Sequence, residues 1–212
     1  MRTDDLIGAL VADLTPRRAS FRRVFAGAIA LGAIVAFVAF LFFIGLRPDI
    51  GHALESERFR MKFVVTLTLL TAEIGLLSRL SVPGVSTGRW AFAWVAAPAL
   101  LALAVAAELV VVPSGDWWKN LLGSNARRCL TLIPFLSIGP LVCLLLALRQ
   151  GAPSDPGLAG AVAGLVAGGA AATLYASHCT DDSPLFVATW YTPAIGLVAL
   201  AGYVIGTRCL RW

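Results

Sequence analysis

Cysteine is the residue type in this chain with the most distinctive chemistry. The sequence has four cysteines, and two of them, Cys129 and Cys179, lie 50 residues apart among charged and polar residues. Two thiols in an oxidising compartment can form a disulfide, bind a soft metal ion or act as a redox pair. Arg127 and Arg128 precede Cys129 and favour its thiolate through their charge. From the residues alone these alternatives stay open, together with a purely structural role for both cysteines.

Residues of metal-ligand type surround Cys179. His178 precedes it, and Asp181 and Asp182 follow it. Cys129, Cys179 and His178 are therefore a candidate ligand set for a transient soft metal ion. The CxxC and HExxH spacings of well-known metal motifs do not occur in the sequence. The spacing thus gives a metal site little support, and no other cofactor is expected.

Two carboxylates, Glu73 and Glu108, lie within strongly apolar segments. Carboxylates are costly inside a membrane and often mark an ion pathway or a buried pair. They define the alternative function, a small ion-coupled membrane transporter with Glu73 and Glu108 as relay groups. In a structural interpretation, nearby polar groups satisfy Glu73, and the candidates are Arg79, Thr66, Thr68, Thr71 and Ser78. Catalysis is not expected, because neither His52 nor His178 has a Ser or Cys partner at a recognisable spacing.

The composition indicates which elements must position these residues. Hydrophobic residues make up 58% of the 212 residues and charged residues 14%, with a mean hydropathy of +0.83. Soluble domains have roughly 45–50% apolar and about 25% charged residues. A chain this small cannot bury so much apolar surface within itself. Lipid is therefore expected to cover much of it, and a soluble globular protein is excluded.

A membrane-spanning helix needs about 20 apolar residues, given the thickness of the hydrocarbon core. The predicted spans are Val24–Leu46, Lys62–Leu80, Trp90–Val112, Cys129–Leu148, Leu158–Ser177 and Phe186–Thr207. The predicted fold class is all-α, a polytopic membrane bundle of six transmembrane helices (residues 24–212) with a short cytoplasmic amino-terminal amphipathic helix and basic hinge (residues 1–23). Gly160, Gly164 and Gly168 recur every four residues and predict close packing of the fifth span against a neighbouring helix.

The positions of the basic residues predict the orientation. Five arginines precede the first span: Arg2, Arg17, Arg18, Arg22 and Arg23. Cytoplasmic flanks carry such an excess, so both termini of a six-span chain are expected inside. Cys129 and Cys179 then lie at the outer face, Cys143 lies deep in the fourth span, and Cys209 lies at the inner end of the sixth. The net charge of +5 reflects these flanks, and binding of nucleic acid is not expected.

The first 14 residues have an apolar stripe at helical spacing. It consists of Leu6, Ile7, Leu10, Val11 and Leu14. Asp4 and Asp5 suit the positive end of such a helix. The helix either lies on the lipid surface or binds in a groove of a soluble partner. Its polar face is small and acidic, whereas surface-seeking helices are usually basic, which favours a soluble partner.

Three segments resemble one known family. They are MRTDDLIGALVADLTP (1–16), RRCLTLIPFLSIGPL (127–141) and SHCTDDSPLFVATWY (177–191). Together they resemble the negative regulators of the sigma-F factor, which are six-span bacterial anti-sigma proteins, and the resemblance covers essentially the whole chain. It implies a multi-pass protein of the bacterial inner membrane that sequesters an extracytoplasmic-function sigma factor until stress is sensed.

The resemblance also implies roles for individual residues. The family's stress-responsive cysteine pair corresponds to Cys129 and Cys179, and Cys143 and Cys209 fall outside the pattern. The sigma factor is expected to bind at the cytoplasmic side, on Asp4, Asp5, Leu6, Ile7, Leu10, Val11 and Leu14. A helix this short buries only part of the roughly 800 Å² per partner of a standard interface. The inner loops or a second copy of the chain are therefore expected to contribute, and the expected partners are a sigma factor, membrane lipid and a possible homo-oligomer.

Overall fold

The computed structural model describes residues 3, 8, 18–82, 88 and 90–210. The predicted amphipathic helix and its binding residues (Asp4, Asp5, Leu6, Ile7, Leu10, Val11 and Leu14) lie outside the described residues. Every regular element in the described part is helical, which confirms the predicted all-α class. The elements are α2 (Arg18–Phe43), α3 (Ile50–Ala53), α4 (Glu57–Leu80), α5 (Trp90–Val111), α6 (Ser114–Leu122), α7 (Ala126–Leu148), α8 (Pro156–Ala176), α9 (Pro184–Phe186), a π-helical segment η1 (Val187–Tyr191) and α10 (Thr192–Cys209).

Five helical segments are long and apolar enough to cross a membrane. They are Phe21–Phe43, Glu57–Leu80, Ser114–Leu148, Pro156–Ala176 and Pro184–Cys209. In α5 the corresponding apolar segment, Val95–Val111, is shorter. Each of the six predicted spans thus coincides with a helix, while the number of six crossings stays a prediction. Long helices are the expected outcome, because a helix satisfies all backbone polar groups internally where water is absent.

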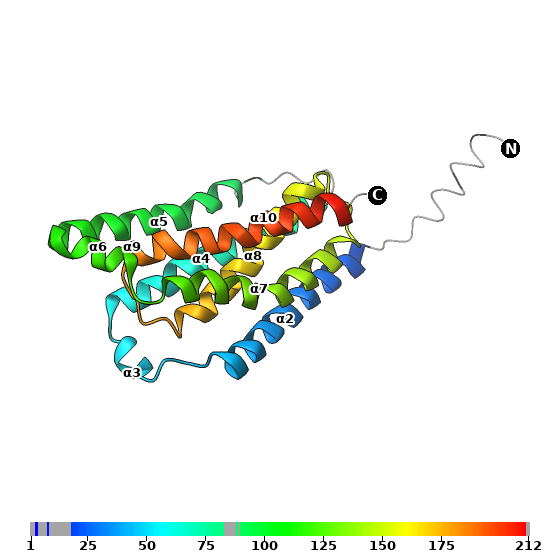
Figure 1. Ribbon diagram of the computed structural model, residues 1–212. Helices are drawn as coiled ribbons and strands as arrows, with labels where there is room; N and C mark the ends of the chain where they lie inside the picture. Colours follow the sequence, from blue (N-terminus) through cyan, green and yellow to red (C-terminus); the bar gives the residue numbers. More distant parts are fainter. Residues whose placement is uncertain (1–2, 4–7, 9–17, 83–87, 89, 211–212) are drawn as a thin grey trace.

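Helix α8 occupies the centre of the bundle (Figure 1) and contacts α10, α4, α7 and α2. Of its 21 residues, 13 are Gly or Ala, so neighbouring backbones can approach closely. A Cβ atom added at Gly160 would lie 2.3 Å from the Gly202 carbonyl oxygen, and one at Gly164 would lie 2.4 Å from that of Val198. The glycine spacing therefore does mark a close helix contact, as predicted, and the neighbour is α10.

The other helices are arranged around this centre. Helix α2 packs on α7, and α5 packs on α4 at the edge of the bundle. Large apolar side chains on these outer helices are exposed, among them Phe37, Phe42, Phe92 and Val110. Contiguous apolar exposure of this extent suits contact with lipid.

The start of α2 and the end of α10 lie at the same end of the bundle, and α3, α6 and α9 lie at the opposite end (Figure 1). We call the latter the distal end. This arrangement agrees with an even number of crossings. Helix α6 was not predicted from the sequence. It is a nine-residue amphipathic helix between α5 and α7, and its Trp117 and Trp118 are exposed. Its exposed aromatic rings suit the membrane–water interface.

Candidate functional site

The structure brings Cys129 and Cys179 together at the distal end. Cys129 lies in the first turn of α7, and Cys179 lies three residues beyond the end of α8. Because α7 and α8 are consecutive antiparallel helices, the start of one lies beside the end of the other. Both thiols are free and fully buried in one cluster of side chains, and they are near enough to influence each other's ionisation. We call these two residues the thiol pair.

Aromatic and aliphatic side chains enclose the thiol pair. Tyr175, Phe186 and Tyr191 belong to the same buried cluster, together with Ile133 of α7. The ring centroids of Tyr175 and Tyr191 are 5.9 Å apart. This setting shields both sulfur atoms from bulk solvent. A reagent can therefore reach them only where the surrounding chain segments let it pass.

The segment that carries Cys179, residues 177–183, is anchored to the start of α7 by Asp181. We call this segment the cysteine loop. The Asp181 carboxylate accepts hydrogen bonds from the backbone N–H groups of Ser124 (2.9 Å) and Asn125 (2.8 Å) and from the Asn125 side-chain amide (2.9 Å). Asn125 directly precedes α7, whose first N–H groups have no partner within the helix. Asp181 therefore binds the two residues that lead into α7 and places its negative charge near the positive end of the helix that carries Cys129.

Asp182 ties the same loop to α4 and to the segment after α2. Its carboxylate pairs with the Lys62 ammonium at 2.5 Å and with the Arg47 guanidinium at 3.0 Å. Arg47 also pairs with Asp49 at 2.7 Å. We call Arg47, Asp49, Lys62 and Asp182 the charged cluster. Its two cations and two anions compensate each other, which a buried group of charges requires.

The charged cluster touches the backbone of Cys179 directly. Lys62 Nζ donates a hydrogen bond to the Cys179 carbonyl oxygen at 3.0 Å, and Arg47 donates one at 3.4 Å. Only 2% of the Lys62 side chain and 7% of the Arg47 side chain are exposed. Both cations also lie over the Phe59 ring, 5.4 Å and 5.5 Å from its centroid. The position of Cys179 is thus fixed by two buried cations from two different elements.

These surroundings change the acidity of Cys179. The hydrogen bond with the Cys129 thiol lowers the pKa of Cys179 to about 7, and the Lys62 ammonium acts in the same direction, while burial opposes both. The thiolate is the nucleophilic and metal-binding form of cysteine. Cys179 is therefore the member of the thiol pair prepared to react near neutral pH.

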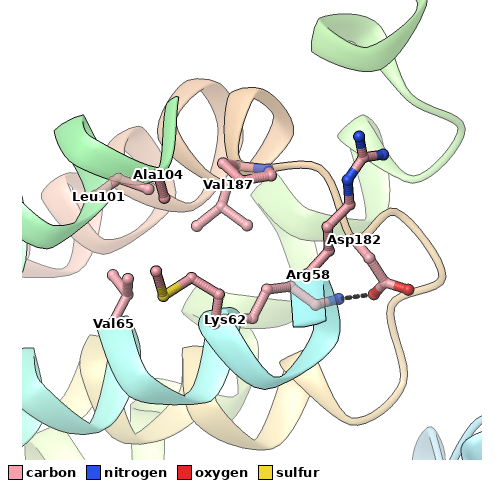
Figure 2. A pocket seen from close by; sticks show the side chains of 9 residues that line it. Arg58, Lys62, Val65, Leu101, Ala104, Asp182 and Val187 are labelled. Carbon is pink, nitrogen blue, oxygen red and sulfur yellow. Dashed lines mark ion pairs between the residues drawn. The ribbon is translucent and has the colours of Figure 1, made fainter. Parts of the chain in front are cut away.

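A polar hollow and a small inner cavity lie beside the cysteine loop. The hollow has a volume of about 580 Å³ and is lined by residues that include Arg58, Lys119, Asp181 and Asp182. The inner cavity, about 10 Å³, lies between Lys62 and Asp182 on one side and the apolar side chains of α5 and η1 on the other (Figure 2). This is about the space of one water molecule. Polar solutes can thus reach the cysteine loop at its residues 180–183.

Comparison with known proteins places this site in a family. Residues 10–212 match the family model described as "Negative regulator of sigma F". The chain belongs to this family. One curated relative, the "Anti-sigma-F factor NrsF" of Caulobacter vibrioides, is 37% identical over the full length of both chains. Another, the "Probable anti-sigma-F factor NrsF" of Azospira oryzae, is 33% identical, again over the full length of both. No solved structure matches the chain.

His178, the third candidate ligand, has a different environment from the thiol pair. Its Nδ1 lies 3.0 Å from the Gly45 carbonyl oxygen, just after α2. Within the part of the chain that the structure describes, no three His, Cys, Asp or Glu side chains are grouped so that they could hold a metal ion. The structure thus does not gather Cys129, Cys179 and His178 into one ligand set. A thiol-only metal site and the sensing role of the pair stay predictions.

Glu108 and Glu73 have contrasting environments. Glu108 accepts hydrogen bonds from the Ser183 hydroxyl (2.8 Å) and the Leu185 N–H (3.1 Å), so it caps the turn that begins α9. Its other oxygen contacts Asn120 at 3.2 Å. These contacts give Glu108 a structural role, and its part in the transporter alternative stays a prediction.

The expectation that hydroxyl groups satisfy Glu73 is wrong. The Thr66, Thr68, Thr71 and Ser78 hydroxyls donate to backbone carbonyls of α4 itself. A helix offers such carbonyls three and four residues back, and a short hydroxyl side chain reaches them more easily than a side chain on another face. Glu73 is fully buried, and neither carboxyl oxygen has a hydrogen-bond partner among the described residues.

Sequence reasoning did not identify Lys62 and Arg47 as parts of the site. Lys62 was predicted only as the first residue of a span, although Asp182 was recognised as a possible ligand. Their position in the sequence could have indicated a role in the site. Cations at the outer ends of spans are less common than at the inner ends in membrane proteins, so they indicate a local partner of opposite charge. An acidic pair beside a cysteine, DD at 181–182, offers that partner.

Proposed function

We propose that this protein is a membrane anti-sigma factor that senses stress through the thiol pair. It holds a sigma factor of the extracytoplasmic-function type at the inner membrane, with both termini in the cytoplasm, and releases it when Cys129 and Cys179 react. Membership of the family of negative regulators of sigma F supports the regulatory role. The observation that carries the sensing role is that two free, buried thiols share one cluster, one of them on a loop held by the charged cluster.

Binding of the sigma factor is assigned to the amino-terminal segment. The apolar stripe that ends at Leu14 offers anchors at helical spacing for a groove on the partner. Since the stripe is too small for a standard interface, the inner loops at residues 80–89 and 149–155 complete the surface, or a second copy of the chain does. Nucleic acid takes no direct part in this interaction.

A two-electron oxidant such as a peroxide is the simplest stimulus. The Cys179 thiolate attacks one peroxide oxygen, its sulfur becomes a sulfenic acid, and the O–O bond breaks to release hydroxide, which takes up the proton that Cys179 had lost and leaves as water. The Cys129 thiol then displaces hydroxide from this sulfur, and the proton of Cys129 leaves with the hydroxide as water. In total, two thiols lose two electrons and two protons and one disulfide forms. A soft metal ion that bridges the two thiolates is a second route to the same link.

Either link changes the contacts that hold the distal end together. A disulfide requires the two sulfur atoms at about 2.05 Å and a fixed dihedral angle, so the cysteine loop must move relative to α7. The reaction also removes the negative charge of Cys179 from the neighbourhood of Lys62. Because Lys62 belongs to α4 and Cys179 follows α8, the shift reaches two helices that run to the opposite end of the bundle. There it alters the surface that holds the sigma factor.

Single and double cysteine substitutions test this proposal. In cells, with a reporter under control of the cognate sigma factor, Cys129→Ser and Cys179→Ser are each expected to blunt the response to peroxide. The double variant is expected to behave like either single one, because a two-thiol site fails when one member is lost. Cys143→Ser, which changes a cysteine outside the pair, is the matched control and is expected to respond normally. Additive effects of the two substitutions, or a normal response of the double variant, would contradict a shared site.

A further inference from the structure

Glu73 is a buried carboxyl group that the proposed sensing mechanism does not use. It lies near the middle of α4, is 0% exposed, and both of its oxygen atoms lack a hydrogen-bond partner among the described residues. An ionised carboxylate without a partner is far more costly in an apolar interior than the neutral acid. An unsatisfied group of this kind in a native fold calls for a physical reason.

No charged group on the helices packed against α4 compensates Glu73. The titratable residue of α8 is Tyr175, six residues beyond Gly169, or about 9 Å along the helix. The titratable residue of α5 is Glu108, which is bound to the turn at α9. On α4 itself, Arg79 follows Glu73 by six residues and is exposed. Glu73 is therefore surrounded by apolar groups in the part of the chain that the structure describes.

Helix α8 leaves room for this carboxyl group and for little else. The residue of α8 nearest to it is Gly169, where an added Cβ atom would lie 3.1 Å from Glu73 Oε2. The contact is tight on a rigid backbone, so on the Gly169 side a water molecule or a counter-ion has no room unless α4 and α8 separate. The neutral acid is stable in this apolar contact, whereas the unpaired anion is too costly there.

From this geometry we infer that Glu73 is a proton-binding site. Its carboxyl group holds a proton while α4 and α8 are packed, and loss of that proton separates the two helices at this level. Proton release and helix separation are thus two sides of one equilibrium. The same two helices position Lys62 and Cys179 at the distal end, so occupancy of the site affects the thiol pair. This inference rests on the packing around Glu73 and does not require the anti-sigma role.

An apolar groove offers a way to probe the site from the lipid side. The groove has a volume of about 430 Å³ and is lined by α2, α4 and α8, with Leu70 and Ala170 among its residues. Leu70 also contacts the position of Gly169, so the groove ends beside the carboxyl group. An apolar carbodiimide can enter it. A protonated carboxyl group adds across one C=N bond of the reagent, and the O-acylisourea product rearranges to a stable N-acylurea with no atoms lost.

The first experiment treats the full chain in detergent micelles with dicyclohexylcarbodiimide and locates the label by peptide mass spectrometry. We expect labelling of Glu73 at pH 6, at least tenfold less at pH 10, and none in Glu73→Gln. Glu55, an exposed carboxylate outside the apolar groove, is the internal reference and is expected to stay unlabelled. Labelling of Glu73 that is equal at pH 6 and pH 10 would overturn the inference.

The second experiment tests proton binding by Glu73 even if the carbodiimide does not reach this residue. Thermal melting of the full chain is compared with that of Glu73→Gln between pH 6 and pH 9. The separated helices let Glu73 ionise and the packed ones do not, so the wild-type melting temperature must fall as pH rises, by roughly 3 °C per pH unit relative to Glu73→Gln. The control Glu55→Gln is expected to follow the wild type. Parallel melting curves of wild type and Glu73→Gln would overturn the inference.

Discussion

Replacement of Lys62 by Met is expected to make Cys179 less reactive at neutral pH. An opposite charge within about 4–6 Å lowers the pKa of an acid by about 1–3 units. Because the hydrogen bond with Cys129 is the larger cause of the low pKa of Cys179, we assign the smallest of these shifts, about one unit, to Lys62. The pKa of Cys179 then rises from about 7 to about 8, and its thiolate fraction at pH 7 falls from about one half to about one tenth.

The assay is the rate of alkylation of Cys179 by iodoacetamide, read by peptide mass spectrometry between pH 5 and pH 10. In the wild type the rate is expected to rise with pH around a midpoint near 7, because the reactive thiolate forms as the proton leaves. In Lys62→Met the midpoint should move upward, and the rate at pH 7 should fall about fivefold.

Two controls separate charge from packing. Arg60→Met removes an exposed cation from the same helix and should leave the profile unchanged. Lys62→Arg keeps the charge and should keep the midpoint near that of the wild type, even if the fit in the site is poorer. An unchanged midpoint in Lys62→Met, in a protein that elutes and melts as a folded chain, would refute the assigned role of Lys62.

Three further predictions concern the loop, the bundle and the partner. Asp181→Ala should lower the free energy of unfolding by about 2 kcal/mol, since the start of α7 loses an anionic cap, and thermal melting would measure this. Gly164→Leu should destabilise the bundle by about 1–3 kcal/mol, because even a Cβ atom there would lie 2.4 Å from a carbonyl oxygen of α10. The triple change of Leu6, Leu10 and Leu14 to Asp should abolish co-purification with the sigma factor, because three apolar anchors worth ~1.5–3 kcal/mol each are lost.

Each of these predictions has its own control. Asp116→Ala alters an exposed acidic residue of α6 and should have little effect on melting. Gly196→Ala places a Cβ atom in open space, so it should be tolerated, and equal effects at both glycines would contradict the packing argument. Full repression by the triple Leu variant would show that the sigma factor binds elsewhere on the chain.

The helical architecture could be predicted from the sequence because lipid imposes one strong constraint. Apolar runs such as the one that became α2 must be helical when no water satisfies the backbone. The glycine spacing in α8 predicted close packing for the same local reason, but it could not name α10 as the neighbour. Which helix packs against α8 depends on how the whole chain folds, and the spacing of glycines carries no information about that.

The candidate site was predictable only in part. Chain direction alone put Cys129 and Cys179 at the same end of two consecutive helices, and the structure has both residues in one buried cluster. The inward positions of Lys62 and Arg47 were not predicted. A charged residue at the end of a span is normally expected to be solvated, and only the structure shows that Asp182 is the partner of both cations. The hydroxyls near Glu73 were misassigned because backbone carbonyls of the same helix compete for them.

Retention of the sigma factor before and after oxidation tests the central claim most directly. Wild-type protein and Cys129→Ser, each bound to the cognate sigma factor in detergent, would be treated with peroxide, and the retained sigma factor and the disulfide would be quantified in the same samples. We expect the wild type to lose its partner in step with formation of the Cys129–Cys179 disulfide, and Cys129→Ser to retain it. Equal release from both proteins, or complete disulfide formation without release, would contradict sensing through this thiol pair.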